Sequence, residues 1–214
     1  MSKWMTQDWT TGQLNALVKN IGEANARAII AGKAKVSVVM ESVMTLVTTF
    51  IFQAQPRFVA RDHFKVDTSD KAEVKIAFIW DDFQSHFLGK IEEAVVEVEL
   101  AVRSLDKDLL DKDIRAELGE EKEETTLAQF WALLKAQDHG QSGPLLTNGY
   151  ANIFYIRDAK STLWAVNANW NADNGGWNVN ANSVTNPNRW NAGNQVVSRN
   201  YDVSPPILLR RSFV

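Results

Sequence analysis

Side-chain amides gather in one segment of the chain, and their spacing follows a pattern. Asn stands at every second position of two runs, at Asn167, Asn169 and Asn171 and again at Asn178, Asn180 and Asn182. Each side-chain amide offers two donors and one acceptor, but it carries neither a titratable proton nor a nucleophile. The chemistry available to these residues is therefore recognition through hydrogen bonds rather than catalysis.

Residue types that support catalysis or metal binding are scattered along the chain. The three histidines, His63, His86 and His139, are too far apart in sequence to suggest a pair of metal ligands. The chain has no cysteine and no GxSxG, P-loop or GxGxxG motif. The adjacent pairs Asp81-Asp82 and Glu92-Glu93 are interpreted as solvent charges. We therefore expect no enzymatic activity, no metal site and no cofactor.

A β-hairpin is the element that would place the amides on one surface. Side chains alternate between the two faces of a strand, so the Asn residues of each run share a face. Asn174-Gly175, between the runs, is a strong signal for a two-residue type I′ turn. This turn predicts a register in which Asn171 faces Asn178, Asn169 faces Asn180 and Asn167 faces Asn182. We expect these six side chains to be exposed, and the opposite face to bury Trp164, Trp170 and Trp177.

Four more Asn residues follow the hairpin. Asn186, Asn188, Asn191 and Asn194 surround Pro187 and Trp190 in a predicted loop, and a strand is predicted over residues 195–199. Because Asn is depleted in strands, the amides of the hairpin do not serve strand stability. Three interpretations stay open: a polar sheet that faces solvent, a flat amide array that binds ice, sugar or a polymer, and a surface whose gene is built for variation.

The segment WNADNGGWNVNANSVTNPNRWNAGN resembles the C-terminal region of the variable proteins of diversity-generating retroelements. In that family the binding face is copied from a template with adenine-specific errors, so Asn codons mark positions that can change. The resemblance covers residues 94–200 in the order of elements and is specific in residues 164–200. It implies a C-type lectin-like fold whose hypervariable ligand-binding surface contains the ten Asn residues named above. Asn186-Pro187-Asn188 and Trp190-Asn191-Ala192 depart from the calcium-binding motifs of lectins, so the resemblance implies neither calcium nor sugar binding.

The remaining pattern predicts an α+β fold in two parts. Residues 1–90 form an N-terminal α/β segment, with helices over 11–21 and 23–31 that end at glycines and strands over 36–52 and 74–80. Residues 94–214 form the C-type lectin-like domain, with a strand over 94–103, helices over 105–118 and 125–137, and a strand over 150–156. The run EEKEE at 120–124 is predicted to be a solvated connection. The N-terminal segment is expected to attach the protein or to form a homo-oligomer.

Charge and hydropathy limit the partners of the chain. The net charge of -3 and the pI near 5.7 give no broad attraction to nucleic acid, and Arg27 is the one basic residue of the second helix. The most apolar run, residues 36–52, is about one turn shorter than the ~20 residues of a membrane span and contains Glu41. The N-terminus has no signal-peptide pattern, so we expect a soluble protein that is cytoplasmic or virion-associated.

These patterns favour a ligand-binding display protein whose partner is an unknown protein or a surface ligand. The alternative is a structural virion, tail or assembly protein in which the Asn-rich sheet is merely solvated. In the first hypothesis the Asn positions vary and bind the partner. In the second the amides only face solvent.

Overall fold

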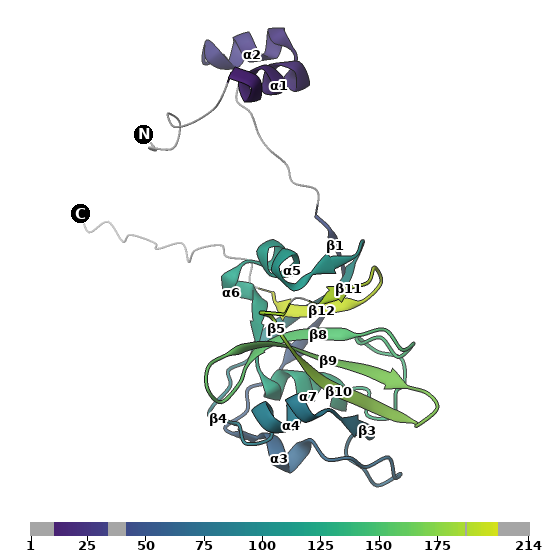
Figure 1. Cartoon of the computed structure of the whole chain (residues 1–214). Helices are drawn as coiled ribbons and strands as arrows, with labels where there is room; N and C mark the ends of the chain where they lie inside the picture. Colours follow the sequence, from purple (N-terminus) through teal and green to yellow (C-terminus); the bar gives the residue numbers. More distant parts are fainter. Residues whose placement is uncertain (1–10, 34–41, 187, 201–214) are drawn as a thin grey trace, which may run out of the picture. The chain divides into compact units, whose positions relative to one another are not determined.

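The computed structural model describes residues 11–33, 42–186 and 188–200 (Figure 1). The chain divides into two compact units, Met1–Glu41 and Ser42–Val214. The first unit contains helix α1 (Thr11–Ile21) and helix α2 (Glu23–Ile30). Gly22 separates them with a φ of 81°, a left-handed conformation that favours glycine. This confirms the two short helices that the sequence predicts.

The second unit is built on an eight-stranded mixed sheet in the order β1-β5-β12-β8-β9-β10-β3, with β7 paired to β8. Its strands are β1 (Met44–Phe52), β3 (Ile76–Ile79), β5 (Val98–Leu105), β7 (Glu124–Thr125), β8 (Asn152–Arg157), β9 (Leu163–Asn171), β10 (Gly176–Ser183) and β12 (Gln195–Arg199). Two small sheets pair β2 (Phe58–Val59) with β4 (Ile91–Glu92), and β6 (Leu109–Leu110) with β11 (Arg189–Trp190). The fold is therefore mixed α+β, as predicted.

Helices cover both faces of this sheet (Figure 1). On one face α3 (Ala60–His63), α4 (Asp81–Phe87) and α7 (Leu127–Lys135) contribute to a large core that includes Phe83, Phe130 and Trp177. On the other face α5 (Asp111–Leu118) packs into a smaller core with Tyr155 and Trp190. The short helix α6 (Glu120–Glu123) follows α5. Because the central strands are buried on both faces, β8 is almost continuously apolar.

The division between units lies earlier than the predicted boundary near residues 90–94. Strand β1 pairs antiparallel with β5, with Met44 opposite Leu105, and β3 pairs parallel with β10. Strands on both sides of residue 90 therefore belong to one sheet. Such pairings join residues far apart in the chain, and local hydrophobic periodicity carries no information about them. The part of the predicted 36–52 strand that precedes Ser42 lies outside the described residues.

The predicted helix over 105–118 is shorter than expected. Leu105 is still part of β5, Leu109-Leu110 pair with Arg189-Trp190 as β6, and the helix begins only at Asp111. Pairing with a distant strand overrides the helical pattern of residues 105–110. Gly119 ends the helix with a φ of 81°. Of the predicted solvated run, residues 120–123 form α6, and Glu123 is buried with Arg115 Nη2 2.9 Å from its Oε1.

The helix predicted over 125–137 is α7, and its N-cap is Thr126. Thr126 Oγ1 accepts a hydrogen bond from Gln129 N at 3.2 Å, and Gln129 Oε1 accepts one from Thr126 N at 3.0 Å. These reciprocal bonds form a capping box. Leu127, Phe130, Trp131, Leu133 and Leu134 are buried in the large core. None of the helices in the described part of the chain is long and apolar enough to cross a membrane.

Candidate ligand-binding face

The predicted hairpin is formed by β9 and β10, but its register differs by two residues from the prediction. Asn178 pairs with Asn169 and Asn180 with Asn167, so the connection is the four-residue loop 172–175 rather than a two-residue turn. A shift of one residue would reverse the two faces, whereas a shift of two preserves them. The six Asn residues therefore share one face as predicted. We call Asn167, Asn169, Asn171, Asn178, Asn180 and Asn182 the Asn face.

Tertiary contacts explain the observed register. It places Trp170 opposite Trp177, and the two rings meet edge to face with centroids 5.4 Å apart, a favourable cross-strand aromatic pair. Asn171 Oδ1 accepts a hydrogen bond from Asn174 N at 3.1 Å, which closes the loop. A Cβ at Gly176 would lie 2.8 Å from Ala77 N, so glycine is needed where β3 approaches β10. The Asn174-Gly175 dipeptide alone predicts none of these contacts.

The two faces of the hairpin differ as the sequence predicts, although not to the expected degree. Trp164 and Trp177 are buried in the large core, whereas Trp170 is only half-buried at its edge. The expectation that all six amides are exposed is wrong, because Asn167 is 7% exposed, Asn178 is 9% exposed and the other four are half-buried. Strands β8 and β3 flank the hairpin on both sides, so these short side chains are less accessible than they would be on an isolated hairpin.

The amides of the Asn face do not bond to one another in the described structure. Their hydrogen bonds are local: Asn180 Oδ1 accepts from Ala181 N at 2.8 Å, and Asn167 Nδ2 reaches Ala165 O at a long 3.5 Å. Asn178 Oδ1 is buried and has no hydrogen-bond partner. The sheet is therefore held by its backbone ladder and its apolar face, and not by an amide network.

The loop after the hairpin contains Asn residues with different roles. Asn186 and Asn191 are exposed and Asn188 is half-buried, so all three are accessible. Asn194 is buried, and its Oδ1 accepts a hydrogen bond from Ala151 N at 2.8 Å. Its backbone N–H also closes a turn onto Asn191 O at 3.1 Å. Asn194 thus anchors the loop, and it does not belong to an accessible surface.

Asp111 holds this loop in place, and sequence reasoning missed its role. Its carboxylate is fully buried and accepts hydrogen bonds from Trp190 Nε1 at 2.8 Å, Tyr155 Oη at 2.9 Å and Asn188 N at 3.2 Å. Burial raises the pKa of Asp111, although these three donors act in the opposite direction. The signal in the sequence is indirect: buried Tyr and Trp need a polar partner.

Glu92 is a second buried carboxylate, and its interpretation as a solvent charge is wrong. Its two oxygens accept from Leu127 N and Ala128 N, each at 2.9 Å, and Lys90 Nζ lies 2.9 Å from Oε1. These are free N–H groups of the first turn of α7, where a negative charge is stabilised. Glu93 and the pair Asp81-Asp82 are exposed, as expected.

Each of the three histidines lies near a different acidic side chain. His63 Nδ1 lies 3.7 Å from Glu73, His86 Nδ1 lies 3.2 Å from Asp158, and His139 Nδ1 lies 2.9 Å from Asp138. Within residues 11–33, 42–186 and 188–200, no group of three His, Asp or Glu side chains is placed to hold a metal ion.

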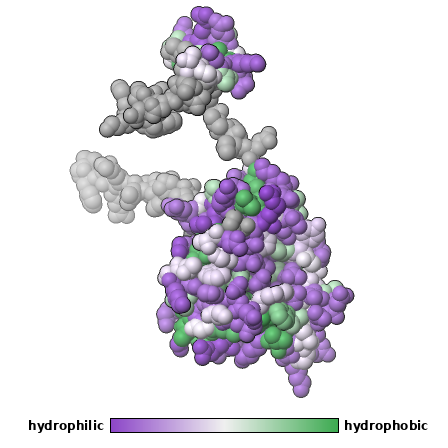
Figure 2. Space-filling view, viewed as in Figure 1, coloured by the Kyte–Doolittle hydropathy of each residue, from purple (hydrophilic) through white to green (hydrophobic). Residues whose placement is uncertain are grey.

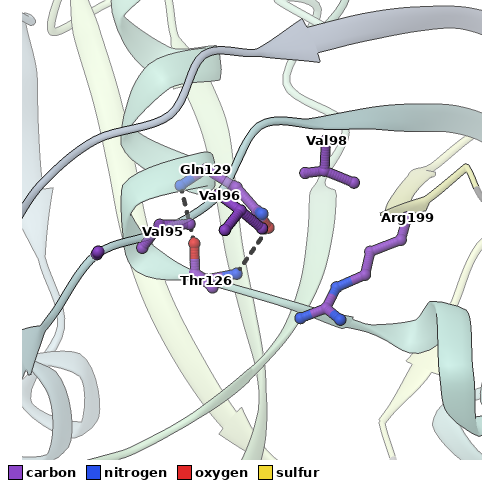
Figure 3. A pocket seen from close by; sticks show the side chains of 7 residues that line it. Val95, Val96, Val98, Thr126, Gln129 and Arg199 are labelled. Carbon is purple, nitrogen blue, oxygen red and sulfur yellow. Dashed lines mark hydrogen bonds between the residues drawn. The ribbon is translucent and has the colours of Figure 1, made fainter.

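A hollow of about 210 Å³ lies beside the start of α7, lined by Ala94, Val95, Val96, Val98, Thr126, Gln129 and Arg199 (Figure 3). It is smaller than the ~300–1,000 Å³ of typical small-molecule sites. Thr126 and Gln129 are bonded to each other in the capping box, as the dashed lines in Figure 3 show. The hollow therefore offers aliphatic side chains and the Arg199 guanidinium, but no acid–base pair.

Comparisons with protein-family models, with curated proteins and with solved structures find no match to this chain. Its function is therefore inferred from its own residues and their geometry.

Proposed function

We propose that the protein is a non-enzymatic ligand-binding display protein, similar to the variable proteins of diversity-generating retroelements. The Asn face and the accessible Asn residues of the following loop form its diversifiable binding surface. The partner is a protein or another surface ligand.

The observation that carries this proposal is the separation of roles between the two faces of the hairpin. Trp164, Trp177 and Val179 lie in the large core, while the amides opposite them contribute no bond that joins β9 to β10 through side chains. A side chain at Asn169 or Asn180 can therefore be exchanged without removing a contact on which the sheet depends. This is what a surface built for variation requires.

The order of elements supports a C-type lectin-like domain. Strand β5 is followed by helices α5 and α7 and then by strands β8, β9, β10 and β12, which is the order that the resemblance implies. The loop that follows the hairpin is pinned at both ends, by Asp111 on Asn188 and Trp190 and by Asn194 on Ala151. A fixed backbone presents new side chains at little entropic cost on binding.

The proposal is tested with a library randomised at Asn169, Asn180, Asn182, Asn188 and Asn191. Asn itself has little area to bury, whereas binding hot spots are rich in Trp, Tyr and Arg. We expect folded members with dissociation constants of about 1 μM or better for unrelated protein targets, enriched in Tyr or Trp at the randomised positions. The parent chain, with Asn at every position, is the control and should give background signal.

A library that stays folded and yields no binder to several targets would favour the structural alternative, a virion, tail or assembly protein with a solvated sheet. A second test needs no protein. The DNA around the gene should contain a near-copy of the segment that encodes residues 164–200, differing at adenines, with a reverse transcriptase gene nearby.

A further inference from the structure

Strand β3 extends the Asn face with residues that lie outside the Asn-rich segment. It pairs parallel with β10, with Ile76 opposite Trp177, Phe78 opposite Asn178 and Ile79 opposite Val179. The shift in register between the first two pairs places an extra residue, Ala77, in β3. Residues opposite each other in a ladder project to the same face. Phe78 therefore lies on the side of Asn178, while Ile76 and Ile79 enter the large core.

Phe78 and Trp80 are the two large side chains at this edge. Phe78 is 49% exposed and Trp80 is 40% exposed, and their rings meet edge to face with centroids 4.6 Å apart. The backbone N–H of Trp80 donates to Val179 O at 3.0 Å, so the end of β3 stays fixed to β10. Figure 2 shows hydrophobic surface in the region of β3 on a face that is otherwise mainly hydrophilic. Two exposed aromatic rings that are held in position form a ready contact surface.

Asn178, the neighbour of Phe78 across the ladder, has an unmet hydrogen-bonding need. Its side chain is 9% exposed, and its Oδ1 is buried without a partner. A buried polar atom without a partner is rare and unfavourable. This observation is independent of the exposed rings, and it lies at the same edge of the Asn face.

We propose that Phe78 and Trp80 form a constant aromatic anchor for the partner of the Asn face, and that this partner is a protein surface. The inference rests on the proposed function, and it identifies the part of the binding surface that does not vary. Both rings lie outside residues 164–200, so they remain when the Asn residues change. The partner presents an apolar side chain to the rings.

The uncharged character of the face favours a protein over a charged polymer. The side chains that β3, β9 and β10 place on it are Phe78 and the Asn residues, while Leu163 and Ala165 on the same side are buried in the smaller core. An uncharged centre with aromatic residues and amides has the composition of a protein–protein interface core. Nucleic acids and acidic polymers would require basic residues here.

The test uses binders selected from the library described above against three unrelated folded domains. Phe78→Ser and Trp80→Ser are introduced singly into each binder. We expect the dissociation constant to rise by about tenfold or more in most binders, whatever their target. Trp80→Phe should retain most of the affinity. Ile51→Ser is the matched control, because Ile51 is 59% exposed on β1 at the opposite end of the sheet, and it should leave the dissociation constant unchanged.

A second measurement avoids substitutions. Hydroxyl-radical footprinting of the unaltered binders should show Phe78 and Trp80 protected in the complex, with Ile51 as reactive as in the free chain. Binders that tolerate both serine variants, with unprotected rings, would overturn the anchor and leave the proposed function intact. A folded library without binders would overturn both. Saturable binding of neutral oligosaccharides by the parent chain, lost in Trp80→Ser, would replace the protein partner with a carbohydrate.

Discussion

Trp190 Nε1 donates a 2.8 Å hydrogen bond to the buried carboxylate of Asp111, 79 positions earlier in the chain. The same carboxylate receives Tyr155 Oη and Asn188 N. One side chain therefore connects the start of α5, a core strand and the loop that carries the accessible Asn residues.

Replacing Asp111 with Ala should lower the free energy of unfolding by about 2–4 kcal/mol. The substitution leaves the buried Tyr155 O–H and Trp190 N–H without an acceptor, and each unmet group costs about 1–3 kcal/mol. Asp113→Ala is the control, since Asp113 is exposed in the same helical turn and should cost less than ~1 kcal/mol. Urea unfolding measures both values, and equal effects would mean that the three bonds contribute little.

Glu92→Ala should be far more destabilising than Glu93→Ala, although the two residues are adjacent. The first change removes the acceptor for Leu127 N and Ala128 N and leaves Lys90 without its carboxylate. We expect a loss of about 2–4 kcal/mol in the free energy of unfolding. Glu93 is exposed, and its replacement should stay within about ±0.5 kcal/mol. Similar melting temperatures for the two variants would contradict this role of Glu92.

Gly140→Ala should destabilise the protein through contact with Trp170. Gly140 has a φ of 69°, and a Cβ there would lie 2.2 Å from Trp170 Cε2. Gly149 has a φ of 88° but no atom within 4 Å of the same position. Gly149→Ala should therefore cost about 1 kcal/mol from backbone strain alone, and Gly140→Ala about 1–3 kcal/mol more. Thermal unfolding of the two variants measures both losses of stability. Equal losses would show that the Trp170 ring does not contact the methyl group added at residue 140.

Asp158 should make the protein less stable in acid. Burial by itself raises its pKa, but hydrogen bonds from the backbone N–H groups of Thr162 and Lys160, from Trp164 Nε1 and from His86 bring the pKa below its ordinary value. A carboxylate with a depressed pKa stabilises the fold above the unfolded pKa, ~4, and loses this contribution as the pH falls through the folded pKa. The stability advantage over Asp158→Asn should therefore shrink in urea titrations as the pH falls below the unfolded pKa.

The stability contribution of Asp111 should depend on pH in the opposite direction. Its pKa is raised, chiefly by burial, so its contribution is fully present below the unfolded pKa and is lost as the pH rises through the folded pKa. The advantage of the natural chain over Asp111→Asn should shrink as the pH increases. Parallel trends for the two variants would contradict one of the two pKa directions.

The Asn face should tolerate substitution better than the opposite face of the same strands. Asn169→Ser together with Asn180→Ser should change the free energy of unfolding by less than about 1 kcal/mol, because neither amide bonds to another strand. Asn178→Thr should be neutral or slightly stabilising, since it removes a buried acceptor without a partner and adds a β-branched residue. Trp177→Ala should cost about 3–5 kcal/mol by opening a cavity. A large loss from the Asn variants would show that the amides support the sheet.

Local sequence alone predicts which side chains share a face of the hairpin. Alternation has a period of two, and Gly175 with its neighbours interrupts the chain between the two Asn runs, so these properties are local. The two-residue difference in register left the faces unchanged. The bounds of the two N-terminal helices are local in the same sense, and they were predicted to within about one residue.

The surroundings of the hairpin depend on contacts between residues that are far apart in the chain. The packing of Trp170 on Trp177 and the approach of β3 at Gly176 fixed the register. Asp111, Glu92 and Asn194 gained their roles from groups at least 35 positions away. The placement of Phe78 beside Asn178 likewise comes from a parallel pairing of distant strands. Hydrophobic periodicity indicates which side of an element is buried. Packing across the whole sheet determines which residues cover that side.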